Sequence, residues 1–348
     1  MYENRRNSSD PVRIALVGLG GHGRTMQYAA ETAANVQVIA VFDVVEAEAQ
    51  AAAARFGCEA APSYKALVQR DDLEAVALET PNHLHRPQAE AALAAGLHVC
   101  VAKPIANTVA DGLAIVEAAE AAGRLLMVGH NMRLARAARL ARRAMDEGRL
   151  GKVVSVEAHF SADNTGRLAQ DTWRFRPDQC PLLPLMQLGI HAIDLVHYLI
   201  GPIEEVYARA KSVTTAPGVI DSVAATFCTA EGVLGTMVSN YCTPVAFDYR
   251  IAGTEGTLRC TPHRYWFRRA SDTDPQGDGP AETHDFTEHP LESHVREMEA
   301  FGEAVRTGLP PETDGWAGLQ ALAVVEALQY SAETGKPQRV PSFVKRKA

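Results

Sequence analysis

Residues 13–23 read RIALVGLGGHG. An apolar stretch, Ile14 to Val17, leads into three glycines, and residues 24–34 after them have the composition of a helix. This order of strand, G-x-G-x-x-G and helix is typical of a dinucleotide-binding turn. Its glycines make the tight turn, let a pyrophosphate approach the backbone, and let the helix pack closely on the strand. The N–H groups at the helix start would then face the phosphates. We predict that the cofactor-binding residues of this loop are Gly18, Gly20, Gly21, His22 and Gly23.

A second buried strand, residues 35–42, ends directly before Asp43, which lies twenty residues after Gly23. A carboxylate at this place accepts hydrogen bonds from the ribose hydroxyls of the adenosine and repels a 2′-phosphate. Val44 and Val45 follow it and offer no arginine to hold such a phosphate. We therefore expect Asp43 to bind the cofactor, and the cofactor to be NAD rather than NADP.

Length, charge and cysteine content exclude several classes of protein. The 348 residues, 47% of them apolar, suffice for two domains with their own cores. A net charge of -8 argues against a nucleic acid or an anionic membrane as partner. The six cysteines have neither C-x-x-C nor metal-ligand spacing, which indicates reduced thiols in a cytoplasmic protein without a metal site. We expect residues 1–10 to be disordered, no signal peptide, and no membrane span.

The first half of the chain alternates short apolar runs with alanine-rich helices from residue 13 to residue 129, the pattern of a doubly wound parallel sheet. Ligands of such sheets bind beyond the carboxyl ends of the strands. Two strand ends carry polar groups, TPNHLH at residues 80–85 and AKPIA at 102–106. The loop residues predicted to flank the nicotinamide half of the cofactor are Thr80, Pro81, Asn82 and His85. Lys103 is either one of many solvated lysines or, as we predict from its place at a strand end, a group that points into the cleft.

The second half begins with a basic amphipathic segment, residues 130–148, that we expect to be a helix linking two domains. Its arginines suit a solvated face, except Arg133, which we predict to contact substrate. Alternating apolar and polar residues then predict one broad sheet with strands near 152–161, 204–213, 222–229, 233–240 and 249–253. We interpret the polar segment 268–290 as a mobile surface excursion. The amphipathic segments 291–307 and 316–334 are expected to be helices packed on this sheet.

The motifs VGLGGHG, VFD, TPNHLH, AKPIA and VGHNMR, in this order, resemble the Gfo/Idh/MocA oxidoreductase family over nearly the whole chain. The resemblance implies a Rossmann domain over residues 11–130. It also implies an α+β domain over residues 131–348 with an open, mainly antiparallel sheet, and a homodimer or homotetramer. Members mostly oxidise or reduce a sugar or polyol carbon with a nicotinamide cofactor. TWRFRP, residues 172–177, is similar to the family's W-R-x-D-P segment, so Trp173 and Arg174 are expected to contact substrate.

Carried over onto this chain, the family's catalytic trio is Lys103, Gln187 and His191. The segment LLPLMQLGIHAIDLVHYLIG, residues 182–201, departs from the family pattern. Gln187 stands where the family has aspartate, Leu182 and Leu183 replace a double glycine, and Ala102 replaces the glutamate before Lys103. Helical spacing would put Gln187, His191 and Asp194 on adjoining parts of one face. The residues alone favour a buried helix histidine at position 191, bonded to a neighbour such as Asp194, and it is the resemblance that favours catalysis.

The resulting hypothesis is hydride transfer between NAD and a secondary alcohol. His191 would accept the hydroxyl proton, Lys103 would favour the developing alkoxide, and Gln187 would orient both by hydrogen bonds. One alternative is a lyase, glycosidase or epimerase that binds NAD tightly and recycles it. Another is a nucleotide-binding sensor that has lost its chemistry.

Overall fold

The computed structural model describes residues 10–272 and 281–343. The chain divides into two compact units. Unit 1 takes the chain up to Asn131 together with His289–Leu319, and unit 2 takes Met132–Glu288 together with the chain from Gln320 onward. We describe each unit by itself.

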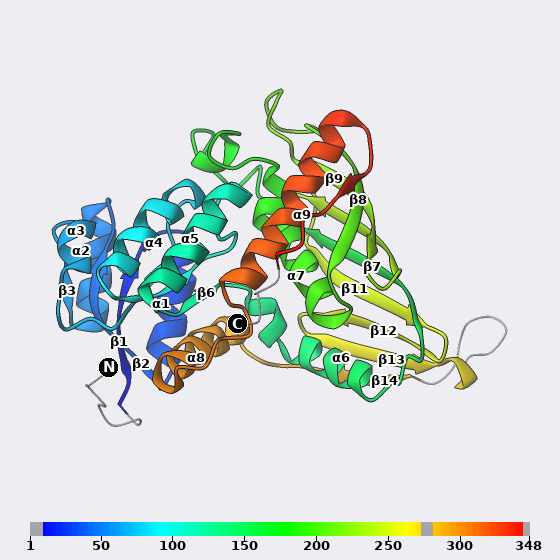
Figure 1. Ribbon diagram of the computed structural model, residues 1–348, viewed down its shortest axis with the longest axis horizontal. Helices are drawn as coiled ribbons and strands as arrows, with labels where there is room; N and C mark the ends of the chain where they lie inside the picture. The colour runs from blue at the N-terminus through cyan, green and yellow to red at the C-terminus, as the bar shows by residue number, and fades with distance from the viewer. Residues whose placement is uncertain (1–9, 273–280, 344–348) are drawn as a thin grey trace. The chain divides into compact units, whose positions relative to one another are not determined.

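Unit 1 contains a parallel sheet with the strand order β3-β2-β1-β4-β5-β6 (Figure 1). The strands in the described residues are β1 Val12–Val17, β2 Val36–Phe42, β3 Glu59–Ala60, β4 Ala75–Leu78, β5 His98–Val101 and β6 Leu126–Val128. The helices that alternate with them are α1 His22–Thr32, α2 Glu46–Phe56, α3 Tyr64–Val68, α4 His85–Ala94 and α5 Val109–Ala122. Because β1 pairs with both β2 and β4, the strand order reverses at β1, which is where such sheets bind nucleotides. The predicted doubly wound parallel sheet is confirmed.

The helix α8, Glu292–Thr307, belongs to unit 1 and packs against α1, β1 and β2. Met298 and Phe301 on its apolar face have no exposed surface and join the core of the parallel sheet. This differs from the expectation that both C-terminal helices pack on the second sheet. An amphipathic pattern predicts that a helix buries one face, but it carries no information about which sheet receives that face.

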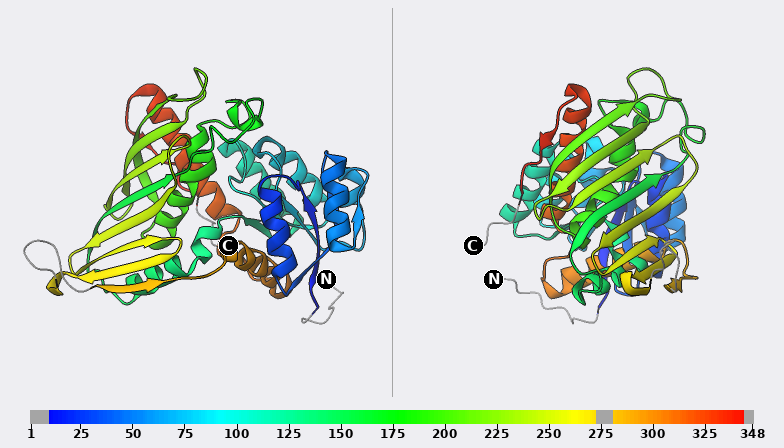
Figure 2. Two further views of the ribbon diagram at one scale, coloured as in Figure 1. Left: turned by 180° about the vertical axis from the view of Figure 1, so that it is seen from behind. Right: turned by 90° about the vertical axis from the view of Figure 1, so that its right-hand side faces the viewer.

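Unit 2 contains a mainly antiparallel sheet with the order β14-β13-β12-β11-β7-β10-β9-β8-β15, in which β7 and β10 are parallel (Figure 2). The strands in the described residues are β7 Val153–Ser161, β8 Ile203–Lys211, β9 Ser222–Thr229, β10 Leu234–Asn240, β11 Ala246–Gly253, β12 Gly256–Thr261, β13 Arg264–Arg269, β14 Glu282–Asp285 and β15 Gln338–Arg339. Helices α6, Arg136–Asp146, and α7, Ile190–Leu199, cover one face of this sheet. The long helix α9, Gly315–Thr334, crosses the boundary between the units, and its Ser331 hydroxyl accepts a hydrogen bond from Ala208 N in β8 at 3.0 Å. The predicted open, mainly antiparallel sheet is confirmed.

Three local expectations differ from the structure or fall outside it. The linking segment is not one helix, because a short 3-10 helix, Asn131–Leu134, precedes α6. The segment 268–290 is not simply an excursion, since β14 pairs with β13 at the sheet edge. Within it, residues 273–280 lie outside the described residues, as do residues 1–9, for which disorder was expected.

Candidate functional site

The glycine loop brings β1, α1 and the end of β4 into close contact. Gly18 has a φ of +85°, and a Cβ there would lie 2.8 Å from the carbonyl carbon of Glu79. A Cβ on Gly23 would lie 2.0 Å from the carbonyl oxygen of Gly18. A Cβ on Gly20, by contrast, would meet no atom within 4 Å. Two glycines are therefore required by the protein's own packing, whereas the open space at Gly20 fits a pyrophosphate.

Asp43 lies beside this loop at the end of β2. Its Oδ2 accepts a hydrogen bond from Leu19 N at 2.6 Å, and its Oδ1 accepts one from Val45 N at 2.8 Å. These bonds fix the carboxylate next to the glycine loop. The neighbouring Val44 and Val45 remain 88% and 52% exposed. The arrangement suits recognition of a ribose at this edge of the sheet.

The TPNHLH loop, after β4, does not offer all its side chains to a ligand. The Thr80 hydroxyl donates to Gln88 Oε1 at 2.5 Å, and Asn82, 4% exposed, begins a 3-10 helix. His85 has no exposed surface, and its ring nitrogens lie 3.0 Å from Pro104 O and 2.9 Å from Thr80 O. Burial lowers the pKa of His85, and the hydrogen bonds to Thr80 O and Pro104 O oppose this shift. The prediction that His85 contacts the cofactor is therefore not compatible with the structure: this ring holds together the two loops that follow β4 and β5.

Lys103 follows β5 at the carboxyl edge of the parallel sheet and is half-buried. Two groups of α8, Glu297 and His294, feel its positive charge. Burial is the largest cause of both pKa shifts, and the charge of Lys103 lowers the pKa in each case. Burial is nevertheless the larger effect on Glu297, which is 1% exposed and whose pKa lies well above the ordinary value. A Cβ on Gly129 would lie 3.0 Å from Glu297 Oε1 and 3.5 Å from the Cα of Ala102. The Glu297 carboxyl group and the backbone of Ala102 thus both lie close to Gly129.

In unit 2, Gln187 lies in a π-helical turn, Leu185–Gly189, that runs directly into α7. A π turn spaces its hydrogen bonds by five residues rather than four, so the α-helical spacing assumed for Gln187, His191 and Asp194 does not hold across it. The turn is anchored to the sheet, because the Ser239 hydroxyl donates to Phe160 O at 2.7 Å and to Pro184 O at 3.0 Å. His191, half-buried, is the second residue of α7.

Gln187 is held by side chains from the segment that precedes it. Its Oε1 accepts a hydrogen bond from Arg174 Nε at 3.2 Å, and its amide nitrogen donates to Cys180 Sγ at 3.6 Å. The Arg174 guanidinium also lies over the Trp173 ring, 4.5 Å from its centroid. Burial raises the pKa of Tyr241 to about 12, and the positive charge of Arg174 opposes this shift. The structure thus brings Trp173, Arg174 and Gln187 together.

Arg133, predicted to contact substrate, forms a buried ion pair with Asp194. Its Nε and Nη2 donate to the two carboxylate oxygens of Asp194 at 2.7 and 2.6 Å. Arg133 is 8% exposed and Asp194 is fully buried. The pair joins the segment before α6 to α7, so the prediction for Arg133 is wrong in this geometry.

Sequence reasoning missed Glu79 and Tyr241, and it expected no role for Cys180. Glu79 was visible as an acidic residue closing the apolar strand EAVALE, which is an unusual place for a charge. Its carboxylate, 1% exposed, accepts from His22 Nδ1 at 2.7 Å. Cys180 and Tyr241 lie far apart in the sequence, and no local pattern marks them.

Among residues 10–272 and 281–343, no cluster of three or more His, Cys, Asp and Glu side chains has a geometry that would hold a metal ion. In the same ranges, no helix is long and apolar enough to cross a membrane. All six cysteines lie in these ranges and have free thiols.

Comparisons with known proteins match both units. Residues 12–130 match the family model described as "Oxidoreductase family, NAD-binding Rossmann fold", and residues 138–259 match "GFO/IDH/MocA C-terminal domain". A D-xylose 1-dehydrogenase (NADP(+)) of Haloferax volcanii is 31% identical over 337 residues, covering 92% of this chain and 98% of that protein. An inositol 2-dehydrogenase of Salmonella typhimurium is 25% identical and covers 96% of this chain and 99% of that protein. A solved levoglucosan dehydrogenase in complex with NADH has the same fold, with a TM-score of 0.89 at 23% identity, covering 96% of this chain and all of the other.

Proposed function

Because this chain belongs to the Gfo/Idh/MocA oxidoreductase family, we propose that it transfers a hydride between a nicotinamide dinucleotide and a secondary alcohol of a sugar, polyol or related hydroxylated compound. The observation that carries this proposal is the match of both units to the family, in a chain whose glycine loop leaves Gly20 open to a pyrophosphate. When bound, the nicotinamide supplies the hydride acceptor or donor. The chain's own residues bind and orient the alcohol and move its proton.

Three residues carry the chemistry in this proposal. His191 accepts the hydroxyl proton, because an imidazole titrates near the working pH. Lys103 holds the substrate oxygen and stabilises the negative charge that develops on it. Gln187 is a neutral hydrogen-bonding group whose amide is already oriented by Arg174 and Cys180. It can therefore position the alcohol but cannot raise the pKa of a neighbouring histidine as a carboxylate would.

We assign the remaining cofactor and substrate contacts from the positions of the residues in the fold. The cofactor is held by the glycine loop, Asp43 and the Thr80–Asn82 segment, and the substrate by Trp173 and Arg174. Arg174 suits a hydroxylated substrate because its guanidinium combines several donors with a planar surface. Arg133 and His85 leave the set because both are buried in contacts with the protein itself.

We propose NAD as the preferred cofactor. The carboxylate of Asp43 beside the glycine loop accepts hydrogen bonds from ribose hydroxyls and repels a 2′-phosphate. Exposed Val44 and Val45, next in the chain, provide no positive charge. The NADP dependence in the name of the Haloferax volcanii relative makes cofactor choice a direct test of this argument.

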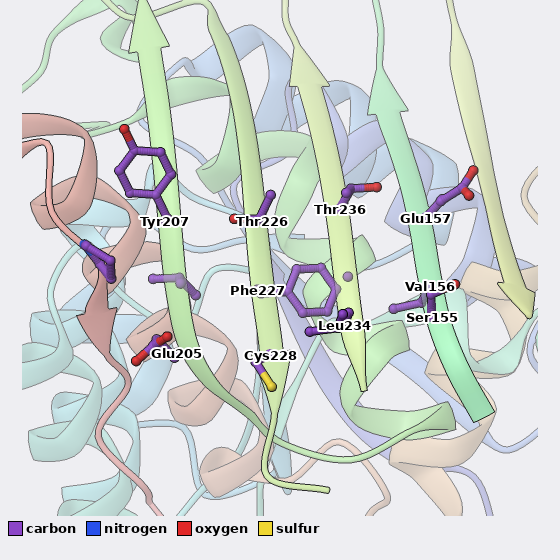
Figure 3. Close-up of a pocket in the computed structure, with 13 residues that line it drawn as sticks. Ser155, Val156, Glu157, Glu205, Tyr207, Thr226, Phe227, Cys228, Leu234 and Thr236 are labelled. Carbon is purple, nitrogen blue, oxygen red and sulfur yellow. The ribbon is translucent and has the colours of Figure 1, made fainter. Parts of the chain in front are cut away.

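We also propose that the enzyme is a cytoplasmic homodimer or homotetramer that associates through the outer face of the second sheet. A shallow groove on this face is lined by side chains of four neighbouring strands (Figure 3). Leu234 is 62% exposed on one of these strands, and Tyr207, Thr226, Thr236 and Glu157 also line the groove. A flat, mixed sheet face of this kind buries apolar area when a second copy covers it. The six free thiols suit a reducing compartment.

The experiment that tests the proposal is NADH formation by the purified protein with a panel of inositols, aldoses and sugar acids, run in parallel with NADP. Lys103→Met serves as the blank. Turnover with NAD that vanishes in the variant supports a dehydrogenase with Lys103 in its site. Bound NAD without net reduction on any substrate would overturn the proposal, and favours an enzyme that recycles its cofactor or a nucleotide-binding sensor.

A further inference from the structure

A buried carboxylate lies directly beneath the glycine loop. Glu79 follows β4, and its Cβ would lie 3.7 Å from a Cβ placed on Gly23. Only 1% of its side chain is exposed, and its Oε2 lies 2.7 Å from Nδ1 of His22. Within the described residues, its Oε1 has no hydrogen-bond partner. A carboxylate removed from water needs a nearby positive charge or it takes up a proton. The His22 ring is the group in direct contact with it.

His22 is placed to connect this carboxylate to the dinucleotide. It is the first residue of α1, directly after Gly21, and 35% of its side chain is exposed. Because Glu79 accepts from Nδ1, the ring proton is fixed there and Nε2 is the nitrogen that remains for a ligand. In a neutral ring this Nε2 is only an acceptor. A pyrophosphate also offers only acceptors, so a neutral His22 cannot bond to it, whereas an imidazolium can.

We propose that His22 takes up a proton from solvent when the dinucleotide binds and donates it in a hydrogen bond from Nε2 to the pyrophosphate, while Glu79 holds the imidazolium through Nδ1. This inference rests on the nucleotide-binding role of the glycine loop. It assigns Glu79 a positioning role that the glycine motif does not include.

Two other titratable groups, His294 and Glu297 on α8, lie near His22 and Glu79. The ring of His294 on α8 lies 5.5 Å from that of His22, centroid to centroid, and burial, with the charges of His22 and Lys103, lowers its pKa to about 3. Burial and the charge of Glu79 raise the pKa of Glu297, while Lys103 opposes this shift. Burial therefore disfavours the charged form of both His294 and Glu297. The ring in direct contact with the Glu79 carboxyl group is that of His22.

The test is calorimetric titration of NADH into the protein in buffers of different ionisation enthalpy, which measures the protons taken up per NADH bound. The wild-type protein should take up a fraction of a proton at about pH 7 to 8. His22→Asn should abolish this uptake, and Glu79→Gln, which keeps an acceptor for Nδ1 but no charge, should reduce it. His263→Asn, at an exposed histidine in the turn between β12 and β13, is the matched control and should leave the uptake unchanged.

The affinity for NADH gives a second readout. His22→Asn should bind NADH roughly tenfold to a hundredfold more weakly than wild type at about pH 6, and this difference should shrink at about pH 9 because fewer protons are available to form the imidazolium. Wild-type binding without proton uptake, or uptake that persists in His22→Asn, would overturn this inference and leave the proposed hydride transfer intact. Failure of the wild-type protein to bind any nicotinamide dinucleotide would overturn both.

Discussion

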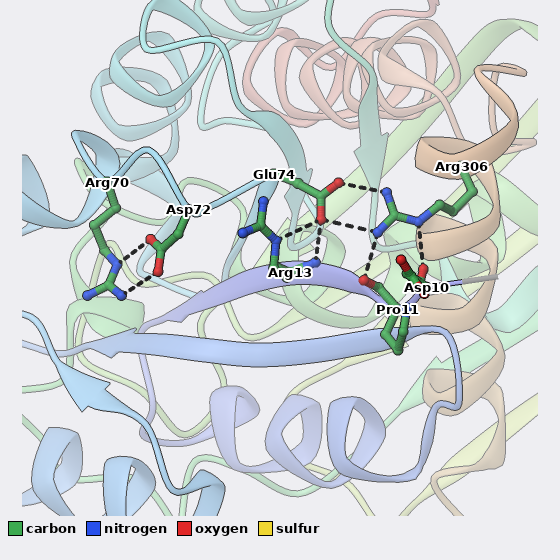
Figure 4. Close-up of polar contacts among 7 residues, drawn as sticks. All are labelled: Asp10, Pro11, Arg13, Arg70, Asp72, Glu74 and Arg306. Carbon is green, nitrogen blue, oxygen red and sulfur yellow. Dashed lines mark hydrogen bonds and ion pairs between the residues drawn. The ribbon is translucent and has the colours of Figure 1, made fainter. Parts of the chain in front are cut away.

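Replacing Glu74 by glutamine should remove a stabilising ion pair that ties α8 to the start of the parallel sheet. Glu74 immediately precedes β4 and receives hydrogen bonds from Arg13 N at 3.0 Å, Arg13 Nε at 3.2 Å and Arg306 Nη1 at 2.7 Å (Figure 4). Arg306 also donates to the carbonyl oxygens of Asp10 and Pro11, each at 2.7 Å. One carboxylate therefore joins the C-terminal end of α8 to the beginning of β1. The same helix carries His294 and Glu297 to the site.

The magnitude follows from the pKa of Glu74. Burial raises this pKa, but the hydrogen bonds and charges of Arg306 and Arg13 outweigh burial and bring it from 4.5 to about 2. One pKa unit corresponds to about 1.4 kcal/mol, so the pair contributes at most roughly 3 kcal/mol to the free energy of unfolding. Because 21% of the Glu74 side chain is exposed to water, about 2 kcal/mol is the expected value. The pKa is lower in the folded chain, so this stabilisation is present above about pH 4.5 and is lost as the pH falls towards 2.

The assay is urea denaturation followed by the fluorescence of Trp316, the tryptophan of unit 1, in a background with Trp173→Phe and Trp266→Phe. Glu74→Gln should lower the free energy of unfolding by about 2 kcal/mol at neutral pH, and by about half of that near pH 3. Glu303→Gln, at an exposed glutamate of the same helix, is the control and should change it little. A loss that is equally large at both pH values, or no loss at neutral pH, would refute the electrostatic reasoning.

Three further substitutions test the site and its support. His191→Ala should lower kcat by roughly a hundredfold to ten-thousandfold in steady-state assays with an unchanged circular dichroism spectrum, and full activity would transfer the role of base to Lys103. Asp194→Asn leaves Arg133 as a buried, uncompensated charge and should lower the free energy of unfolding by roughly 3 to 5 kcal/mol, so an unchanged thermal midpoint would contradict the structural role of this pair. Asp43→Ser should raise KM for NAD and increase kcat/KM for NADP relative to NAD, and an unaltered ratio would show that this carboxylate does not select the cofactor.

Local sequence patterns were most informative where the chain's neighbours in space are also its neighbours in sequence. Gly23 was interpreted through packing between adjacent elements, and the 2.0 Å that would separate a Cβ there from Gly18 O bears out the close approach. Likewise, the alternation of residues in β7, β9 and β10 predicted a sheet with one buried face. Interpretation of single polar side chains was less successful. Arg133 and His85 have the chemistry of ligand-binding groups, but their partners, Asp194 and Pro104, lie 61 and 19 residues away along the chain.

The departures from the family pattern also have different physical consequences. Leu182 stands where the family has glycine, and with a φ of 49° it is the one non-glycine residue with a positive φ among the described parts of the chain. The left-handed backbone is thus adopted without glycine, the residue that adopts it most easily, at a conformational cost of roughly 1 kcal/mol. Gln187 makes polar contacts with Arg174 and Cys180 although it has no charge.

By itself, the sequence determined the two sheets, the position of the nucleotide-binding turn and the family, because hydrophobic periodicity and glycine spacing are local properties of the chain. Only the tertiary structure decided that α8 packs with the parallel sheet, that Arg133 pairs with Asp194, and that Glu79 lies against His22. Each of these depends on segments that meet after long loops have closed. A buried charge takes whichever partner the packing brings within a few ångströms, and no local pattern in the chain encodes that choice.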